Sequence, residues 1–428
     1  MAEDAVAAKR RRRGGGGDMS ALPEHVLQEI LSRMGAVKDL FMFAATCRRW
    51  LGRFTDQTFL REILCPGQGQ GLLGFFLQDA RQGVTMGTQA DAARLASACS
   101  FLPAPRSPLG PGPTARALTS SLVADGDGDG DGAFDYAVPL AARRGIVLMQ
   151  RIPRRRDTHL LLGVCNPVIG ERHLLAPLDR DPTNICGYAI ITAADVHADA
   201  DAAGRFTFSQ LLVATVDPSN RVLHLHLYSA ATRSWSAPTQ CLVKGRRGCF
   251  SRAGRRSAVV HQGAAHWLWL YDDTGGQRAL PGARDDSSLY KLSVQLGGGG
   301  AAAAGPICFA FARIPVRVGG NPPLCVTGDG KLAVVCVYIS HVAVSTCRQQ
   351  QQAGGGHGRP RRTGSAPPSR SSAVFIVDLH RKTVEKVMDC FLPLFADKMN
   401  RTAVPYEMDL VDFFMLKLGG LSSTGSSG

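Results

Sequence analysis

The sequence predicts an α+β multidomain protein, in which a small three-helix unit precedes a large all-β domain with a propeller-like arrangement. Apolar residues recur at helical spacing between residues 20 and 64. From residue 72 to residue 418, short β-branched runs alternate with turn residues, and no sustained helical stretch separates them. Glycine is frequent, at 48 of 428 residues, which also argues against a mostly helical chain.

The first segment, residues 1–17, is rich in Ala, Arg and Gly and contains a basic run from Lys9 to Arg13. It has too few apolar residues to form a core, so we expect it to be disordered. The basic run fits a nuclear import signal and fits a solvated tail equally well, and the sequence does not choose between them.

Residues 18–64 form the helical unit. Pro23 fits the first turn of a helix, where its missing N–H costs nothing. Ile30 and Leu31 lie on the apolar face of this first helix, and Leu40 and Trp50 belong to the two apolar stripes that follow. A unit of about 45 residues buries too little surface to be stable by itself. We therefore expect a partner or a neighbouring domain to complete its core.

A Gly-rich linker at residues 65–71 leads into the β domain at residues 72–418. Its predicted strands are 72–77, 145–149, 160–164, 188–192, 210–216, 222–228, 257–261, 266–271, 289–294, 307–311, 331–338, 373–378 and 383–388. Three segments have the pattern strand, turn, return strand, namely 160–172, 223–235 and 373–385. So many strands exceed one ordinary sandwich, and a radial propeller accommodates them without long exposed edges.

Three low-complexity tracts interrupt the β domain, at residues 124–133, 297–305 and 348–372. They consist largely of Asp and Gly, of Gly and Ala, and of Gln, Gly, Pro, Arg and Ser, respectively. None has the composition of a packed element, so we expect surface loops. Residues 419–428 are expected to form a second disordered tail.

The net charge of +14 comes from four basic tracts. These tracts, at 9–13, 143–156, 244–256 and 348–372, carry +22 together, so the remainder of the chain carries −8. A nucleic-acid-binding domain usually has basic residues over one whole face. The charge pattern therefore argues against nucleic acid as the main partner.

Cysteine usage and motif content favour a protein without catalytic or metal chemistry. The 12 cysteines are scattered, with no CxxC pair and no secretory segment, which indicates a reducing compartment and no zinc site. No apolar run approaches the roughly 20 residues that span a bilayer, so we expect a soluble protein of the nucleus or cytoplasm. The sequence has no nucleophile elbow, Walker loop, HExxH or paired-carboxylate motif. We expect no cofactor and no enzymatic activity.

Two histidine pairs allow a functional interpretation and a structural one. His224 and His226 fall on one face of a strand, where they form either half of a metal site or a packed pair. His261 and His266, beside Trp267, either line a pocket or belong to a hairpin that packs its aromatic residues in the core. The structural interpretation is favoured for both pairs.

The helical unit resembles an F-box. The matching residues are Leu22–Met34, Lys38–Leu40, Ala44, Cys47–Trp50 and Phe59. An opening Leu-Pro and a later Cys-Arg-Arg-Trp give this pattern its specificity, and the sequence departs from it at Gly35, where the family often has Pro. The resemblance covers about 45 residues and implies a three-helix fold.

The β region resembles the F-box-associated domains of plant proteins, which adopt propeller-like folds. Residues Cys165–Arg172 resemble a CNPxTGE segment, with Ile169 where Thr is usual, and Gly263–Trp267 resemble a GxxHW segment. Both motifs are short.

The F-box resemblance implies a substrate-recognition subunit of an SCF-type ubiquitin ligase. The F-box would bind the adaptor subunit, and through it the cullin, while the β domain would bind an unknown protein substrate for degradation. By this resemblance the adaptor-binding residues are Leu22, Pro23, Ile30, Leu31, Leu40 and Trp50. Apolar anchors of this type are what helical modules use to bind apolar grooves.

Two other functions remain open at this point. The basic tracts allow a nuclear nucleic-acid-associated protein, whose binding would fall steeply with salt. A propeller also allows an enzyme with a site in its central channel, which a cluster of polar groups with perturbed pKa values would mark.

Overall fold

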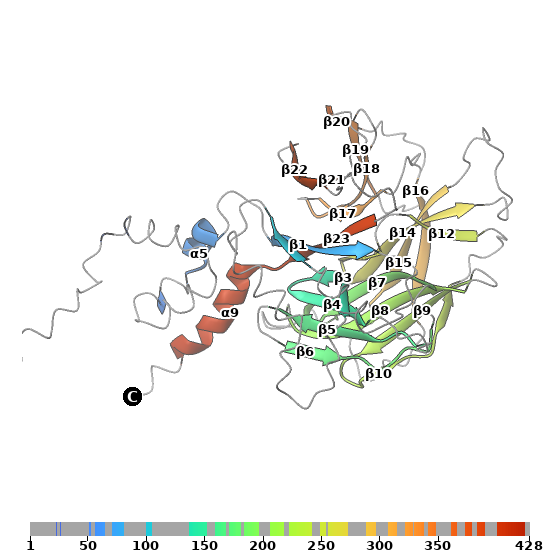
Figure 1. The fold of residues 1–428 in the computed structure, drawn as a ribbon, viewed down its shortest axis with the longest axis horizontal. Coiled ribbons are helices and arrows are strands. Elements are labelled where there is room, and N and C mark those ends of the chain that lie inside the picture. The colour runs from blue at the N-terminus through green and yellow to red at the C-terminus, as the bar shows by residue number, and fades with distance from the viewer. Residues whose placement is uncertain are drawn as a thin grey trace, which may run out of the picture. The chain divides into compact units, whose positions relative to one another are not determined.

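Figure 1 shows a computed structural model of the chain. The structure describes residues 23, 26, 51–52, 56–64, 71–80, 100–104, 137–151, 159–167, 171–180, 184–196, 206–217, 222–241, 249–253, 256–272, 288–296, 307–314, 322–327, 329–337, 341–347, 361–365, 373–378, 383–389 and 400–423. The chain divides into two compact units. One contains residues 1–70, 108–111 and 410–428, and the other contains residues 71–107 and 112–409.

The second unit is mostly β, with four consecutive antiparallel sheets that we call blades 1 to 4. Blade 1 contains β3 (Ala137–Arg143), β4 (Ile146–Arg151), β5 (Leu162–Asn166) and β6 (Glu171–Leu174). Blade 2 contains β7 (Ile185–Thr192), β8 (Phe208–Val216), β9 (Leu223–Ser229), β10 (Ser234–Trp235) and β11 (Thr239–Cys241), with helix α8 (Ala193–Val196) after β7. Blade 3 contains β12 (Cys249–Ala253), β13 (Val259–His261), β14 (Ala264–Asp272), β15 (Ser288–Gln295) and β16 (Phe309–Ile314). Blade 4 contains β17 (Leu324–Val326), β18 (Leu332–Val337), β19 (His341–Thr346) and β20 (Arg361–Ser365).

A further sheet joins strands from opposite ends of this unit. β1 (Leu72–Ala80) lies between β2 (Ser100–Pro103) and β23 (Asn400–Glu407), and all three are antiparallel (Figure 1). β21 (Ala373–Asp378) and β22 (Thr383–Asp389) form a separate hairpin. Because β23 pairs with β1 over eight positions, the late strand is tied to the early one by main-chain hydrogen bonds.

One strand of each blade contacts one strand of the next, which gives the four sheets a propeller arrangement. β3 contacts β7, β7 contacts β13, and β13 contacts β17. Between blades 2 and 3 the contact includes a parallel bridge from Tyr188 to Ser257. The Tyr188 N–H donates to the Arg256 carbonyl at 2.8 Å, and the Ala258 N–H donates to the Tyr188 carbonyl at 2.7 Å.

The hydrophobic core lies between the blades in three layers. Tyr188 and Ile190 of β7 pack into the layer shared with blade 1, whereas Ala189 and Ile191 pack into the layer shared with blade 3. A third layer contains Leu268 and Leu289 of blade 3 with Val334 and Cys336 of blade 4. Side chains alternate across a strand, so a strand covered on both faces needs a continuous apolar run. This explains the unbroken apolar run in β7.

All thirteen predicted strands overlap strands of the structure, and the three predicted hairpins are present as β5–β6, β9–β10 and β21–β22. The prediction of a mostly β, propeller-like domain is thereby confirmed. Residues 361–365 differ from expectation: they lie in the tract predicted to be a loop, yet they form β20. The strand pairs with the edge of blade 4 through its backbone, a kind of pairing that apolar periodicity does not reveal.

Among the described residues of the first unit are the helices α5 (Gln57–Leu64) and α9 (Leu410–Ser423). α9 occupies residues that the sequence suggested were the end of the β domain and a tail, at 72–418 and 419–428. The prediction of three helices in the F-box concerns residues that are largely outside the described ones. In the described part of the chain, no helix has the length and hydropathy needed to cross a membrane.

Candidate functional site

Of the six predicted adaptor-binding residues, the structure describes Pro23. It is exposed, and its carbonyl oxygen accepts a hydrogen bond from the Val26 N–H at 3.1 Å. This bond closes a turn at the position where Pro23 was expected to begin a helix, and Val26 is helical. The other five residues, Leu22, Ile30, Leu31, Leu40 and Trp50, lie outside the described residues.

The helix α5 lies at the end of the predicted F-box, and its start is fixed by a side-chain cap. The Oδ1 atom of Asp56 accepts hydrogen bonds from the N–H groups of Thr58, at 2.9 Å, and Phe59, at 3.3 Å. Such a cap satisfies N–H groups that have no partner inside the helix. Phe59 and Leu60 follow and are buried. Phe59 is the last residue of the F-box resemblance.

The C-terminal helix α9 contacts α5 within the first unit. Its first two turns bury Leu410, Val411, Phe413 and Phe414, each at most 3% exposed. This helix was not predicted, although its sequence contains a start signal. Asp409 stands at the N-cap position, and Asp412 lies in the first turn, where a negative charge favours the helix dipole.

The most polar cluster that the structure describes joins blade 1 to blade 2. Both guanidinium nitrogens of Arg143 donate to the Asp195 carboxylate, with Nη2 2.8 Å from Oδ1. Arg144 lies 3.2 Å from the same carboxylate and donates to Thr192 Oγ1 at 2.7 Å. The Thr192 N–H donates to Asp195 Oδ2 at 2.9 Å.

The Asp195 carboxylate is 7% exposed, and two opposed effects act on its pKa. Burial tends to raise the pKa, whereas the hydrogen bond and the charge of Arg143 lower it, and the net result is a pKa below the usual value. The carboxylate therefore stays ionised and fully hydrogen-bonded, which suits a link between blades and does not suit a catalytic base.

Two of the four histidines singled out in the sequence, His226 and His266, are buried and bonded to hydroxyl groups. His226 is 2% exposed, with Nε2 3.1 Å from Thr215 Oγ1, and His266 is 7% exposed, with Nδ1 2.9 Å from Ser293 Oγ. Burial is the main cause that lowers the pKa of each to about 4, so both are neutral at pH 7. Among the described residues, no group of three His, Cys, Asp or Glu side chains is placed to hold a metal ion.

The segment Gly263–Trp267 belongs to blade 3, and its tryptophan packs against blade 2. Gln262 and Gly263 both have positive φ, of 48° and 70°, and form the turn between β13 and β14. Trp267 is 3% exposed, and its indole N–H donates to the Arg256 carbonyl at 3.2 Å. A Cβ atom at Gly187 of β7 would lie 2.7 Å from the same indole nitrogen, so the ring packs directly on that glycine. The interpretation as a packed hairpin is confirmed.

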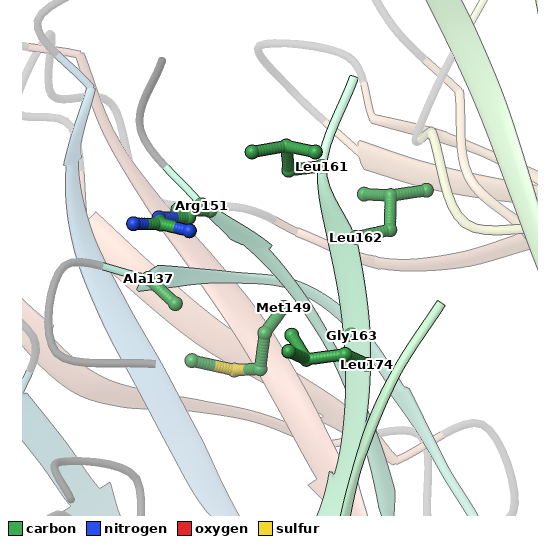
Figure 2. A pocket seen from close by; sticks show the side chains of 7 residues that line it. All are labelled: Ala137, Met149, Arg151, Leu161, Leu162, Gly163 and Leu174. Atoms are coloured by element: carbon green, nitrogen blue, oxygen red, sulfur yellow. The ribbon is translucent and has the colours of Figure 1, made fainter. Parts of the chain in front are cut away.

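Figure 2 shows a hollow on one face of blade 1, at which Gly163 separates Met149 from Leu174 in the sheet. Its cavity volume is about 10 Å³, far below the roughly 300–1,000 Å³ of ordinary ligand pockets. Arg151 is the charged residue in its lining; the others are Ala137, Met149, Leu161, Leu162, Gly163 and Leu174. This lining contains no acid, base or nucleophile for catalysis.

Buried cysteines show no sign of reactivity. Cys241 is 2% exposed, and burial raises the pKa of its thiol to about 12. Burial likewise raises the pKa values of Cys325 and Cys347. Reactive cysteines usually have lowered pKa values, so these thiols are packing residues.

Comparison with known protein families identifies one segment of the first unit by its sequence. The F-box-like family model matches residues 19–65. This chain therefore carries an F-box-like domain. The matched range contains all six predicted adaptor-binding residues and ends just after α5. No curated protein sequence matches the chain significantly.

Solved structures resemble the chain only weakly. An α-L-arabinanase of Penicillium chrysogenum, solved with arabinobiose, is 10% identical, with 54% of this chain and 67% of that chain covered and a TM-score of 0.29. The β-propeller domain of the trilobed protease from Pyrococcus furiosus is 8% identical, with 59% and 81% covered and a TM-score of 0.25. Neither resemblance carries a conclusion about activity, and the propeller arrangement follows from the strand pairing alone.

Proposed function

We propose that the protein is a substrate receptor of an SCF-type ubiquitin ligase. The observation that carries this proposal is an F-box-like domain at residues 19–65 on the same chain as a four-bladed propeller. The F-box-like domain would bind the adaptor subunit, and through it the cullin. The propeller would bind a target protein and hold it near the conjugating enzyme, which raises its effective concentration there.

The proposed adaptor contacts are Leu22, Pro23, Ile30, Leu31, Leu40 and Trp50. Their apolar side chains exceed what a unit of about 45 residues can bury by itself, so a groove on the adaptor would cover them. The exposure of Pro23 is compatible with this role.

We propose a non-catalytic role for the propeller. The polar groups described above connect strands or blades: Asp195 is held by two arginines, and the buried histidines bond to hydroxyl groups. Recognition by such folds uses loops at one face. The segments at 165–172 and 263–267 suggest a domain of the plant F-box-associated type, and a ligase receptor would act in the nucleus or cytoplasm.

The structure weakens the nucleic-acid alternative at one of the four basic tracts. Arg143 and Arg144, which begin the tract at 143–156, are both bound to the buried Asp195, whose single negative charge offsets one of their two positive charges. Tight binding of RNA or DNA that weakens steeply between about 50 and 200 mM salt would support the nucleic-acid alternative.

A pull-down with purified adaptor tests the proposal. We expect the full chain to retain the adaptor, and we expect the variants Leu22→Ala/Pro23→Ala and Trp50→Ala to lose it, because apolar anchors at an interface centre carry most of the affinity. The matched control is Asp329→Ala/Lys331→Ala, which changes an exposed ion pair on the turn before β18 and should bind like the wild type. Failure of the wild type to bind, or equal binding by all variants, would reject the proposal.

A further inference from the structure

The chain enters and leaves the propeller at neighbouring positions. Leu72, the first residue of β1, is paired with Glu407, the last residue of β23. The Met408 N–H continues this pairing by donating to the Gly71 carbonyl at 2.6 Å. Residue 71, where the chain enters β1, and residue 408, where it leaves β23, are therefore joined by a backbone hydrogen bond. This pairing brings the C-terminal segment to the region where the chain leaves the F-box-like domain.

The C-terminal segment is a helix with a strongly apolar first half. Leu410, Val411, Phe413 and Phe414 are at most 3% exposed, and the two phenyl rings lie edge to face with centroids 6.4 Å apart. The spacing i, i+1, i+3, i+4 places these four side chains on one side of the helix.

The helix that faces α9 inside the first unit is the last helix of the F-box-like domain. α5 and α9 are in contact, and residues 410–428 group with residues 1–70 and not with the propeller. Phe59 and Leu60 of α5 are 6% and 0% exposed. A helical unit too small to bury its own apolar residues thus gains a further apolar helix from the other end of the chain.

We propose that α9 is a structural part of the F-box-like domain and that adaptor binding requires it. This inference rests on the proposed function, because it names a further condition for the same interaction. Its consequence is that loss of residues 410–428 would disable adaptor capture although every residue of the family-model match, 19–65, is still present. The adaptor-binding domain is then discontinuous in sequence.

The test uses the full chain, a version ending at Asp409, and two point variants. Phe414→Ala removes a buried side chain from α9, and Leu60→Ala removes one from α5. A version ending at Ser423 is the matched control, because it shortens the chain but keeps the whole of α9. Three quantities are measured: the affinity for purified adaptor by calorimetry, hydrogen exchange at the amides of α5, and near-ultraviolet circular dichroism of the buried Trp267 and Trp269.

We expect the version ending at Asp409 and both point variants to bind the adaptor about tenfold more weakly or worse, since only the fraction of molecules with an ordered domain is competent. Exchange at α5 should rise in parallel, while the tryptophan signal stays native. Unchanged affinity in the version ending at Asp409 would overturn the inference and leave the proposed function standing. If the full chain itself binds no adaptor, the proposed function fails, and α5 exchange separately shows whether α9 protects this helix.

Discussion

At the residue scale, three buried ionisable groups of the propeller have specific partners, and their burial and partners decide how stability depends on pH. Asp195 is buried among Arg143, Arg144 and Thr192, and its pKa lies below the usual value. His226 and His266 are buried in neutral form. Acid therefore acts on these groups in two separate pH ranges.

We predict that Asp195→Asn lowers the free energy of unfolding by about 3 kcal/mol at pH 7, because it leaves two partly buried arginines without their carboxylate. The folded pKa is depressed, so the stabilisation by Asp195 is present above its unfolded pKa of about 4 and is lost as the pH falls through the lower folded pKa. Urea unfolding of both proteins at several pH values measures the difference. A difference that stays constant down to pH 2 would contradict the assignment.

A second prediction concerns His266. Its pKa is about 4 in the folded state, against about 6.5 when unfolded, so the unfolded state binds more protons between these values. Stability should therefore fall as the pH is lowered from about 6.5 to about 4, by roughly 3 kcal/mol in total at about 1.4 kcal/mol per unit. In His266→Gln the slope across this range should be shallower. Identical slopes in the two proteins would show that His266 does not titrate as described.

At the element scale, the blades are held together by the packing of one strand on the next. The close approach of Trp267 to the backbone of β7 requires the absence of a side chain at Gly187. We predict that Gly187→Ala destabilises the protein by about 1–3 kcal/mol, because the new methyl group forces the indole ring to move. Thermal unfolding measures the effect.

Trp267→Phe, which removes the indole nitrogen, provides the matched test of the contact between Gly187 and Trp267. In the Trp267→Phe background, Gly187→Ala should lower the free energy of unfolding clearly less than it does in the wild type. Such non-additivity is expected for residues in contact. Additive effects in the double mutant would show that the alanine acts elsewhere.

The sequence revealed some elements and not others for physical reasons. Strands covered on both faces, such as β7, carry continuous apolar runs and were predicted. The outer strand β20 pairs with β19 through its backbone, and its sequence, Arg-Arg-Thr-Gly-Ser, has no apolar periodicity, so it was not predicted. α9 was not predicted: residues up to 418 were assigned to the β domain and residues 419–428 to a tail, whereas tertiary contacts override the weak helix propensity of a segment that contains Gly419 and Gly420.

At the scale of the whole molecule, the sheet of β1, β2 and β23 links the two ends of the propeller. Its centre is an aromatic cluster, in which Phe76 lies 5.0 Å from Phe101 and 5.4 Å from Tyr406 between ring centroids. The sequence predicted β1 but not its partner β23, because this pairing joins residues more than 300 positions apart. The F-box-like segment, by contrast, was predicted from a local motif. The helix α9 that contacts it became evident only in the structure.

We predict that Phe76→Ala lowers the free energy of unfolding by about 4 kcal/mol, as is typical when a fully buried phenyl ring leaves a cavity. Chemical denaturation followed by tryptophan fluorescence measures the loss. An effect below about 1 kcal/mol would mean that the closing sheet adds little to the propeller.

The central claim is that the F-box-like domain binds the ligase adaptor, and calorimetric titration of the full chain with purified adaptor tests it most directly. We predict saturable binding with one adaptor per chain, at least about tenfold weaker for Trp50→Ala, a residue type that often dominates interfaces. Absence of binding by the wild type, or equal affinities of the wild type and Trp50→Ala, would contradict the account.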